Sequence, residues 1–568
     1  MLRLPTELVI CILNHIPLST LNQLPALSQQ WSNFFEENQS ILYRNAAVLH
    51  GFVPSTAIVY SDLEAIQSGS ATMRNRTALS RRSLIGVSDW KSFCRRQISL
   101  RDAWRGEASS YVTMYRSSLT RRSNVHRIKV DEQRGFAIVT SSAGGIRAVD
   151  LATDQRLWSL SRNDVHPYAH CEYDSGYLIF DRTDGDKEVW RVADDVETTK
   201  DLPTFAFPDD KQKKAWSLIA DLGGHRSRGC FNPWMVLKPP DLTKAFRFVF
   251  PTLIAATHLS LFLWDIPTGE LVQVIRDIQN SSNDVHSSAS LGPHITYVEV
   301  SETHAFVCGS HALRAFSRSS GRCVLDIPSS QLSYGNNTYS FLADGSHKQG
   351  WLSSSVLKPQ PLTHSIVAPD TSGRQLINQF TAVHVSACGS HLAALLADSR
   401  LIIIPFFQRV INKEADIREI SLEIQLGSPA NVSRYLAFEH GRVAVATGTG
   451  LFVINVDFES AVDPPDIIVH RAAWFNAPVG LKSVSCLQMS PTCIFLNWDV
   501  PLGGSRHLKD DDLIPDSDDE EIFNASLADA RNLVHLANGN DIVQLFEPGG
   551  VQITSVLCSI DFAPSEFS

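Results

Sequence analysis

The feature that most constrains the fold is a repeated unit of short apolar segments, separated by tight polar turns, which recurs from about residue 120 onwards. In the clearest copy, one apolar run is followed by Ala143-Gly144-Gly145, a second run, a turn at Thr153-Asp154 and a third run. Short apolar runs bounded by glycine and aspartate are typical of β-strands joined as hairpins. The sequence contains seven such units: 135–158, 176–190, 253–269, 305–317, 392–404, 443–454 and 533–546.

Strand units that repeat along a chain predict the blades of a β-propeller, whose closure into a ring removes free sheet edges. We expect about seven blades, with six or eight as alternatives. No Gly-His dipeptide opens the units, so the repeat is a degenerate one. Leu263-Trp264-Asp265 resembles the end of a WD repeat, whereas residues 146–158 resemble the tryptophan-docking repeat of quinoprotein-type propellers.

The first 45 residues follow a helical pattern. Residues 8–13 are all apolar, so a helix there is apolar on every side, with Pro5 and Glu7 suited to its first turn. A second short helix is predicted over 18–27, and a third carries Trp31, Phe34 and Phe35 on one face. About 45 residues cannot bury this much apolar surface alone. We therefore expect the helices to pack against something else, either another protein or the rest of the chain.

The pattern Leu4-Pro5-x-Glu7-Leu8, Ile12-Leu13, Leu21, Leu24 and Leu27-Ser28-x-x-Trp31 resembles an F-box. F-boxes are helical modules that dock on the Skp-family adaptor of cullin–RING ubiquitin ligases. Leu27 stands where most members have valine, a volume-conserving difference. The resemblance assigns Trp31 and Phe35 to the module's own fold and implies these adaptor-binding residues: Leu4, Pro5, Glu7, Leu8, Ile12, Leu13, Leu21 and Leu24.

Residues 46–118 are expected to form a linker, with a Ser/Thr/Arg-rich stretch followed by a helix. The segment from Trp90-Lys91 to Trp104-Arg105-Gly106 resembles the connection between F-box and propeller in F-box/WD-repeat proteins. The resemblance implies Trp90, Lys91 and Trp104 as anchors of this helix. A rigid helix here suits a ligase, because group transfer depends on positioning.

Two insertions are expected in the propeller, at about 194–251 and 505–525. The first contains Phe205, Trp216 and Trp234 as aromatic anchors and is predicted to cover a blade face or rim. The second includes residues 509–521, with eight acids and one lysine, typical of an exposed loop. Ser517, three residues before Glu520, fits an acid-directed phosphorylation site; a purely solubilising loop is the alternative.

The composition excludes several classes of function. No apolar run approaches the length of a membrane span, and the run at 8–13 is too short for a signal peptide. The ten cysteines are scattered, which predicts no metal or disulfide framework and favours the cytoplasm or nucleus. Residues 1–130 hold sixteen Lys/Arg against eight Asp/Glu, but no interleaved aromatic pattern points to nucleic acid. No catalytic motif or cofactor loop is found.

The sequence thus predicts a multidomain protein with an all-α F-box (1–45), a helical linker (46–118) and an all-β propeller (119–568). The resemblance implies a non-catalytic substrate-recognition subunit of an SCF-type ligase, binding the adaptor and through it a cullin scaffold, with a target protein on the propeller. Related propellers read phosphorylated targets through arginines; Arg147, Arg314 and Arg442 are candidates without an assigned face. The alternatives are a scaffold that does not promote turnover and, more remotely, a quinoprotein-type propeller enzyme.

Overall fold

The computed structural model divides into two compact units, residues 1–110 with 491–493 and 562–568, and residues 111–490 with 494–561. The residues that it describes are 4–53, 79–80, 82–118, 124–198, 203–221, 228–279, 294–341, 355–361, 378–427, 433, 435–439, 441–458, 466–472, 474–475, 477–501 and 553–563.

The first unit is helical. Its elements are α1 (Thr6–Leu13), α2 (Leu18–Leu21), η1 (Leu24–Leu27), α3 (Gln29–Leu49), η3 (Arg82–Leu84) and α5 (Trp90–Trp104).

Helix ends in this unit follow local chemistry. Ser28 begins α3, since its Oγ accepts a hydrogen bond from the Trp31 amide at 3.3 Å. Asp89 begins α5 in a reciprocal capping box with Ser92. The single helix predicted over 18–27 is wrong: α2 ends at Leu21 and a separate 3₁₀ turn follows. Pro25 lies in the first turn of η1, where its missing N–H costs nothing, whereas inside a continuous α-helix it would break a hydrogen bond.

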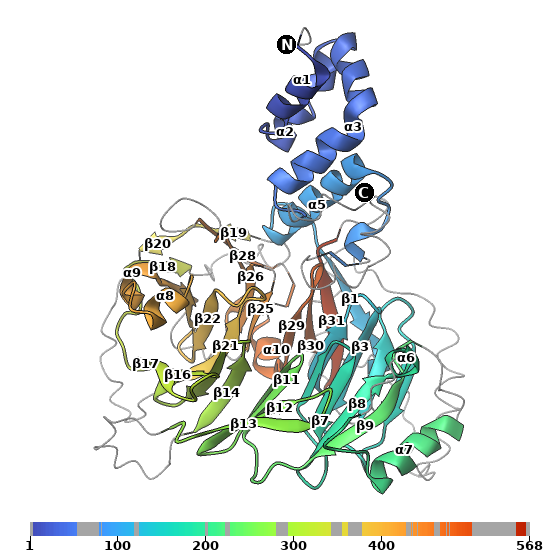
Figure 1. Ribbon diagram of the computed structural model, residues 1–568, viewed down its shortest axis with the longest axis vertical. Coiled ribbons are helices and arrows are strands. Elements are labelled where there is room, and N and C mark those ends of the chain that lie inside the picture. The colour runs from blue at the N-terminus through green and yellow to red at the C-terminus, as the bar shows by residue number, and fades with distance from the viewer. Residues whose placement is uncertain are drawn as a thin grey trace. The chain divides into compact units, whose positions relative to one another are not determined.

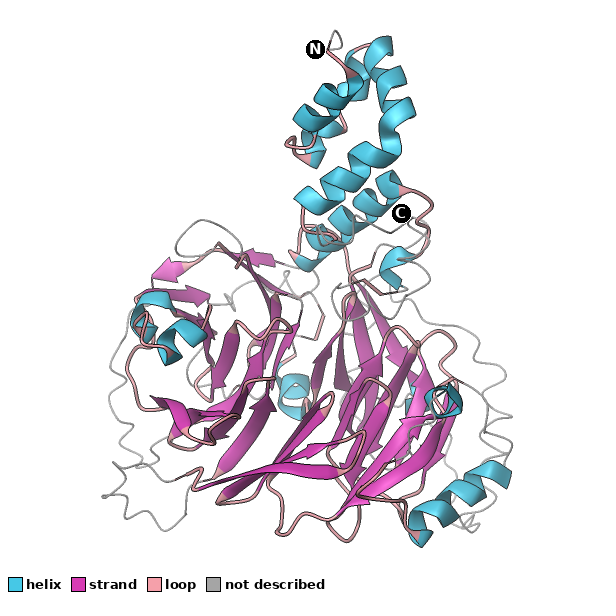
Figure 2. Ribbon diagram, in the orientation of Figure 1, coloured by secondary structure: helices cyan, strands magenta, loops and turns pink. Residues whose placement is uncertain are grey.

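The second unit is a seven-bladed β-propeller (Figures 1 and 2), which confirms the predicted fold class and blade number. The first four blades are β2 (Val125–Asp131), β3 (Phe136–Ser141), β4 (Ile146–Asp150), β5 (Arg156–Leu160); β6 (Cys171–Asp174), β7 (Tyr177–Asp181), β8 (Lys187–Val192), β9 (Phe231–Leu237); β10 (Ala245–Val249), β11 (Thr252–Ala256), β12 (Ser260–Asp265), β13 (Glu270–Arg276); and β14 (Ile295–Val300), β15 (His304–Gly309), β16 (Ala312–Ser317), β17 (Cys323–Pro328).

The fifth and sixth blades have extra edge strands. They are β21 (Phe380–Val385), β22 (Leu392–Leu396), β23 (Arg400–Ile404), β24 (Leu422–Leu426), β18 (Asn337–Phe341), β20 (Gln360–Pro361); and β25 (Tyr435–Glu439), β26 (Arg442–Thr447), β27 (Gly450–Val456), β28 (Ile467–Arg471), β19 (Ser355–Leu357). Short helices in the connections are η4 (Arg116–Ser118), α6 (Ala193–Thr198), α7 (Asp210–Asp221), α8 (Gln408–Ile411), α9 (Ile417–Ile420) and α10 (Pro478–Ser483).

The seventh blade joins the two ends of the propeller sequence. It is built from β29 (Leu487–Met489), β30 (Cys493–Pro501), β31 (Ile553–Asp561) and β1 (Tyr111–Tyr115). Strand β1 runs antiparallel to β31, with Tyr111 opposite Asp561. The first strand of the propeller therefore lies within the stretch 46–118 that the sequence assigned to the linker. This pairing closes the ring, since the first strands of the blades contact one another in the order β2, β6, β10, β14, β21, β25, β29 and back to β2.

The predicted units correspond to the middle strands of six blades. Six of the seven lie on described residues and contain the paired second and third strands β3–β4, β7–β8, β11–β12, β15–β16, β22–β23 and β26–β27. The unit at 533–546 and the acidic loop 505–525 lie outside the described residues.

The predicted insertion at 194–251 is wrong in part, because it supplies two blade strands, β9 and β10, in addition to α7. Trp234 is buried and Trp216 packs on the core between the first two blades, as expected of anchors. Phe205 is 62% exposed, so its side chain does not serve as the expected anchor.

Candidate functional site

Helix α1 is apolar on two neighbouring faces. Val9 and Leu13, four positions apart, are 1% and 2% exposed. Leu8 and Ile12, also four apart, are 52% and 38% exposed. Residues with this spacing lie on one face of a helix. The run at 8–13 therefore divides into an inner face that holds the helical unit together and an outer face that does not.

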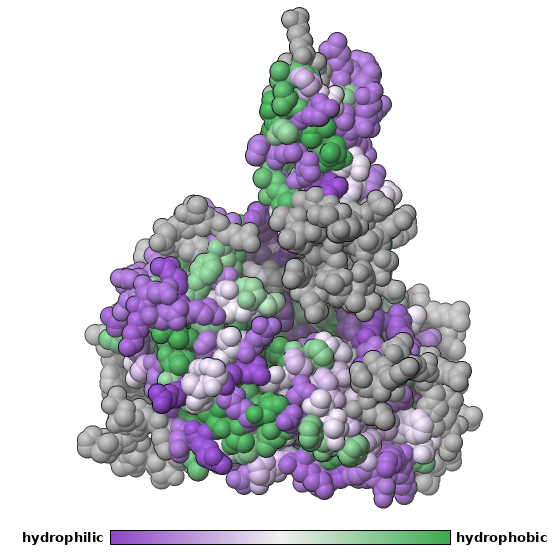
Figure 3. Space-filling view, viewed as in Figure 1, coloured by the Kyte–Doolittle hydropathy of each residue, from purple (hydrophilic) through white to green (hydrophobic). Residues whose placement is uncertain are grey.

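The outer face continues toward the start of the chain through Leu4, 44% exposed, and Pro5, also exposed. We call Leu4, Pro5, Leu8 and Ile12 the α1 stripe. Glu7 lies exposed beside it. Figure 3 shows apolar side chains gathered over α1 and α2 in this unit. Contiguous exposed apolar side chains of this kind mark interaction surfaces.

Three of the predicted adaptor-binding leucines are placed differently. Leu13 and Leu21, 2% and 1% exposed, pack in the core of the helical unit and are not available to an adaptor. Leu24 is half-buried against the same core. Phe35 is buried there and Trp31 packs against it, consistent with the structural role expected for both. Sequence reasoning missed Val9, because a run that is apolar on every side does not show which face is inside.

Helix α5 holds the anchors that the resemblance implied. Trp90 is 7% exposed and lies edge-to-face on Phe93, with ring centroids 5.5 Å apart. Lys91 lies over the Tyr43 ring, with its Nζ 5.8 Å from the centroid. Trp104 is fully buried and its Nε1 donates to the Pro491 carbonyl at 3.1 Å. Its indole also stacks on Phe562 at 3.9 Å, so two distant parts of the sequence meet on this side chain.

The propeller contains a cavity of about 460 Å³ lined by residues from the first strands of all seven blades. Charged groups face one another across it. The carboxylate of Glu172, 2% exposed, lies 2.9 Å from Lys129 Nζ and 2.8 Å from Arg247 Nη1. Arg247 Nε is 3.2 Å from Glu299, whose second oxygen is 2.8 Å from Nδ1 of His384. We call these groups, with Arg127 and His170, the channel cluster.

Ionisation in the channel cluster follows from these contacts. Burial raises the pKa of Glu172, but Lys129 and Arg247 outweigh it and hold the pKa well below its usual range. The pKa of Glu299 is lowered in the same way, against burial, by Arg247 and His384. Burial lowers the pKa of His170. Glu439, which also lines the cavity, has its pKa raised to about 7 by burial.

These residues were not among the predicted site residues, although the sequence carried a signal for them. Each of the charged residues Lys129, Glu172, Arg247 and Glu299 lies in a first strand between apolar or aromatic neighbours. Alternation in a strand sends neighbours to opposite faces. Of these four residues, Lys129, Glu172 and Arg247 line the cavity, and Glu299 pairs with Arg247. A charge between apolar residues in the first strand of a blade is therefore a signal for the central channel.

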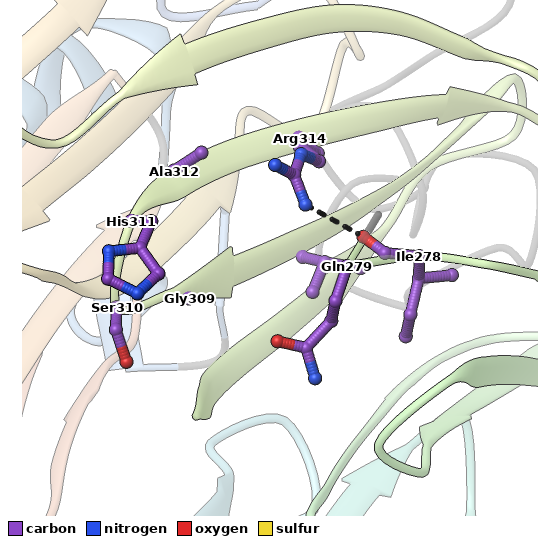
Figure 4. Close-up of a pocket in the computed structure, with 8 residues that line it drawn as sticks. Ile278, Gln279, Gly309, Ser310, His311, Ala312 and Arg314 are labelled. Carbon is purple, nitrogen blue, oxygen red and sulfur yellow. Dashed lines mark hydrogen bonds between the residues drawn. The ribbon is translucent and has the colours of Figure 1, made fainter. Parts of the chain in front are cut away.

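The arginines considered for reading phosphorylated targets lie elsewhere. Arg147 and Arg314 belong to third strands, β4 and β16, and Arg442 to a second strand, β26. Arg314 pairs with Asp326 at 3.2 Å and donates to the Ile278 carbonyl (Figure 4). The pocket beside it measures about 20 Å³, enough for about one water molecule.

Within the described ranges, no group of three or more His, Cys, Asp or Glu side chains is arranged to hold a metal ion. In the same ranges, no helix is both long and apolar enough to cross a bilayer. Ser517 lies outside the described residues.

No protein-family model matches the sequence, and no curated protein matches it. Among solved structures, the chain is similar to the WD40 repeats of RRP9, with 10% identity and a TM-score of 0.39, over 68% of this chain and 89% of that one. It is also similar to the structure of U3-55K, with 10% identity and a TM-score of 0.40, over 79% of this chain and 98% of that one.

Proposed function

We propose that this protein is the substrate-recognition subunit of an SCF-type cullin–RING ubiquitin ligase, working in the cytoplasm or nucleus. The observation that carries the proposal is the α1 stripe, an exposed apolar face on a helical unit whose sequence resembles an F-box. The Skp-family adaptor would cover this face and connect the chain to a cullin scaffold. The propeller would bind a target protein.

The stripe supplies binding energy through surface that is still exposed. Fully burying a leucine or isoleucine side chain is worth about 1.5–3 kcal/mol. Leu8 and Ile12 keep 52% and 38% of their surface exposed, so covering them contributes about 1 kcal/mol each. The subunit performs no covalent step in this scheme: it raises the effective concentration of target lysines near the conjugating enzyme.

Co-purification of the full-length chain with the Skp-family adaptor tests the proposal. The wild type should retain the adaptor, and Leu8→Ala/Ile12→Ala should retain much less. Leu242→Ala, which truncates a 70% exposed leucine in the propeller unit, is the matched control and should behave as wild type. A folded wild type that retains no adaptor would rule out the F-box function. Adaptor binding without a shortened half-life of any bound partner would instead favour a scaffold.

A further inference from the structure

The cavity at the centre of the propeller has the size of a small-molecule site. Its volume of about 460 Å³ lies in the usual range for ligand pockets, about 300–1,000 Å³. Its lining combines charged groups with the rings of Phe246, Tyr297 and Tyr435. In ligand sites, convergent polar groups fix the orientation of the ligand and apolar or aromatic walls pack against its body.

The lining of the cavity has four basic side chains, Arg127, Lys129, Lys244 and Arg247, and three carboxyl groups, those of Glu172, Asp181 and Glu439. Lys129 and Arg247 are matched by Glu172 and Glu299, both of which are ion-paired. Arg127 has no carboxylate within 4.0 Å among the residues that the structure describes. Its Nε donates to Nδ1 of His170 at 3.1 Å, and its Nη1 donates to the Ser485 carbonyl. These partners and the Tyr435 ring beside the guanidinium are formally neutral, so the positive charge of Arg127 is not matched by a carboxylate in the described part of the chain.

His170 is neutral, so it does not change the charge of the cavity. Because Nδ1 accepts from Arg127, the ring proton lies on Nε2, which donates to Glu172 at 2.8 Å. The imidazole is then neutral, in agreement with its lowered pKa. Glu439 lines the same cavity without an ion pair in the described part of the chain, and its raised pKa keeps part of it protonated near neutral pH.

The mouth of the cavity carries a second unusual feature. Tyr168 is 65% exposed, lines the cavity and has a left-handed backbone, with φ of 57°. Its ring lies edge-to-face on the His126 ring, with the ring centroids 5.4 Å apart. A non-glycine residue held in this conformation costs of order 1 kcal/mol or more and persists only where the surrounding structure fixes it.

We propose that the cavity binds a small molecule with a single carboxylate or phosphate group, which pairs with Arg127 while an aromatic or aliphatic body lies against the tyrosine and phenylalanine rings. This inference is independent of adaptor docking. A compact molecule fits better than a protein segment, because seven strands wall the cavity and its charged groups are deeply placed, with Lys129 9% and Glu172 2% exposed.

Isothermal titration calorimetry on the full-length protein tests the proposal. The probes are benzoate and phenyl phosphate, which separate the two anion types, and benzamide, the uncharged analogue of benzoate. We expect one-to-one binding of at least one anion, at least tenfold weaker binding of benzamide, and at least tenfold weaker anion binding by Arg127→Gln. Arg314→Gln, which removes a guanidinium outside the cavity, should bind as wild type.

Three results would overturn the assignment: no anion binding by folded wild type, equal binding by Arg127→Gln, or equal binding of benzamide and benzoate. If Arg127→Gln does not fold, the benzamide comparison on wild type decides by itself. If the protein binds an acidic peptide but neither small anion, the assignment is also contradicted, because the occupant of the cavity would then be a protein segment.

Discussion

Replacing Glu172 by glutamine should weaken the propeller strongly, because this one carboxylate neutralises several groups. It lies 2.9 Å from Lys129, 2.8 Å from Arg247 and 2.8 Å from His170 Nε2, and is 2% exposed. Glutamine keeps the size but removes the charge. Arg247 retains Glu299, whereas Lys129 keeps no ion pair among the described residues.

Removing one partner of a buried pair costs about 3–5 kcal/mol, and because this pair lines a cavity we expect the lower end, about 3 kcal/mol. Urea denaturation followed by tryptophan fluorescence measures the loss. Lys129→Met/Glu172→Gln should recover part of it, because the ammonium group that would be left without a partner is also removed. Glu270→Gln, at an exposed position of β13, is the control and should change little.

The effect also has a defined pH dependence. Glu172 has a pKa well below its usual range, so its contribution is complete above the unfolded value of about 4.3 and is lost as pH falls through the folded pKa. The difference between wild type and Glu172→Gln should therefore be largest near pH 7 and shrink in acid. Equal urea midpoints at pH 7 would refute the assigned role of the channel cluster.

Three further substitutions probe other parts of the molecule. Leu13→Ala should destabilise the helical unit by about 2–5 kcal/mol in thermal or urea unfolding, since Leu13 is 2% exposed; little change would contradict its core placement. Glu439→Gln should raise the thermal midpoint more at pH 8 than at pH 5, because a pKa of about 7 makes ionisation of the folded carboxyl costly as pH rises; an equal shift at both would refute this. His470→Leu should stabilise by about 1 kcal/mol at pH 7, because neither ring nitrogen of this buried histidine has a hydrogen-bond partner within the described ranges; a loss of stability would indicate a partner.

The sequence predicted the middle strands of six blades well. Strands such as β11 and β22 are buried at every position, so they read as continuous apolar runs between turns. First strands are mixed, because they place charges such as Arg247 in the channel and aromatics such as Phe248 between blades. The closing strand β1 could not be predicted, because its partner β31 lies at the other end of the chain.

The candidate binding face was predicted as a region but not residue by residue. A run of six apolar residues does not show which side of the helix is buried. Leu8 is exposed and Leu13 is buried because of how α1 packs in the helical unit. The break after α2 could have been predicted from Pro25. The channel cluster requires the ring itself, which brings Lys129, Glu172 and Glu299 together from three different blades.

The most direct test of the proposed function is the affinity of the purified full-length chain for the Skp-family adaptor, measured by calorimetry. We expect one-to-one binding by wild type. Leu8→Ala/Ile12→Ala should lose about 2 kcal/mol, which corresponds to a dissociation constant about 30-fold higher, without a lower thermal midpoint. Binding that is undetectable with folded wild type, or unchanged in the double variant, would contradict adaptor docking through the α1 stripe.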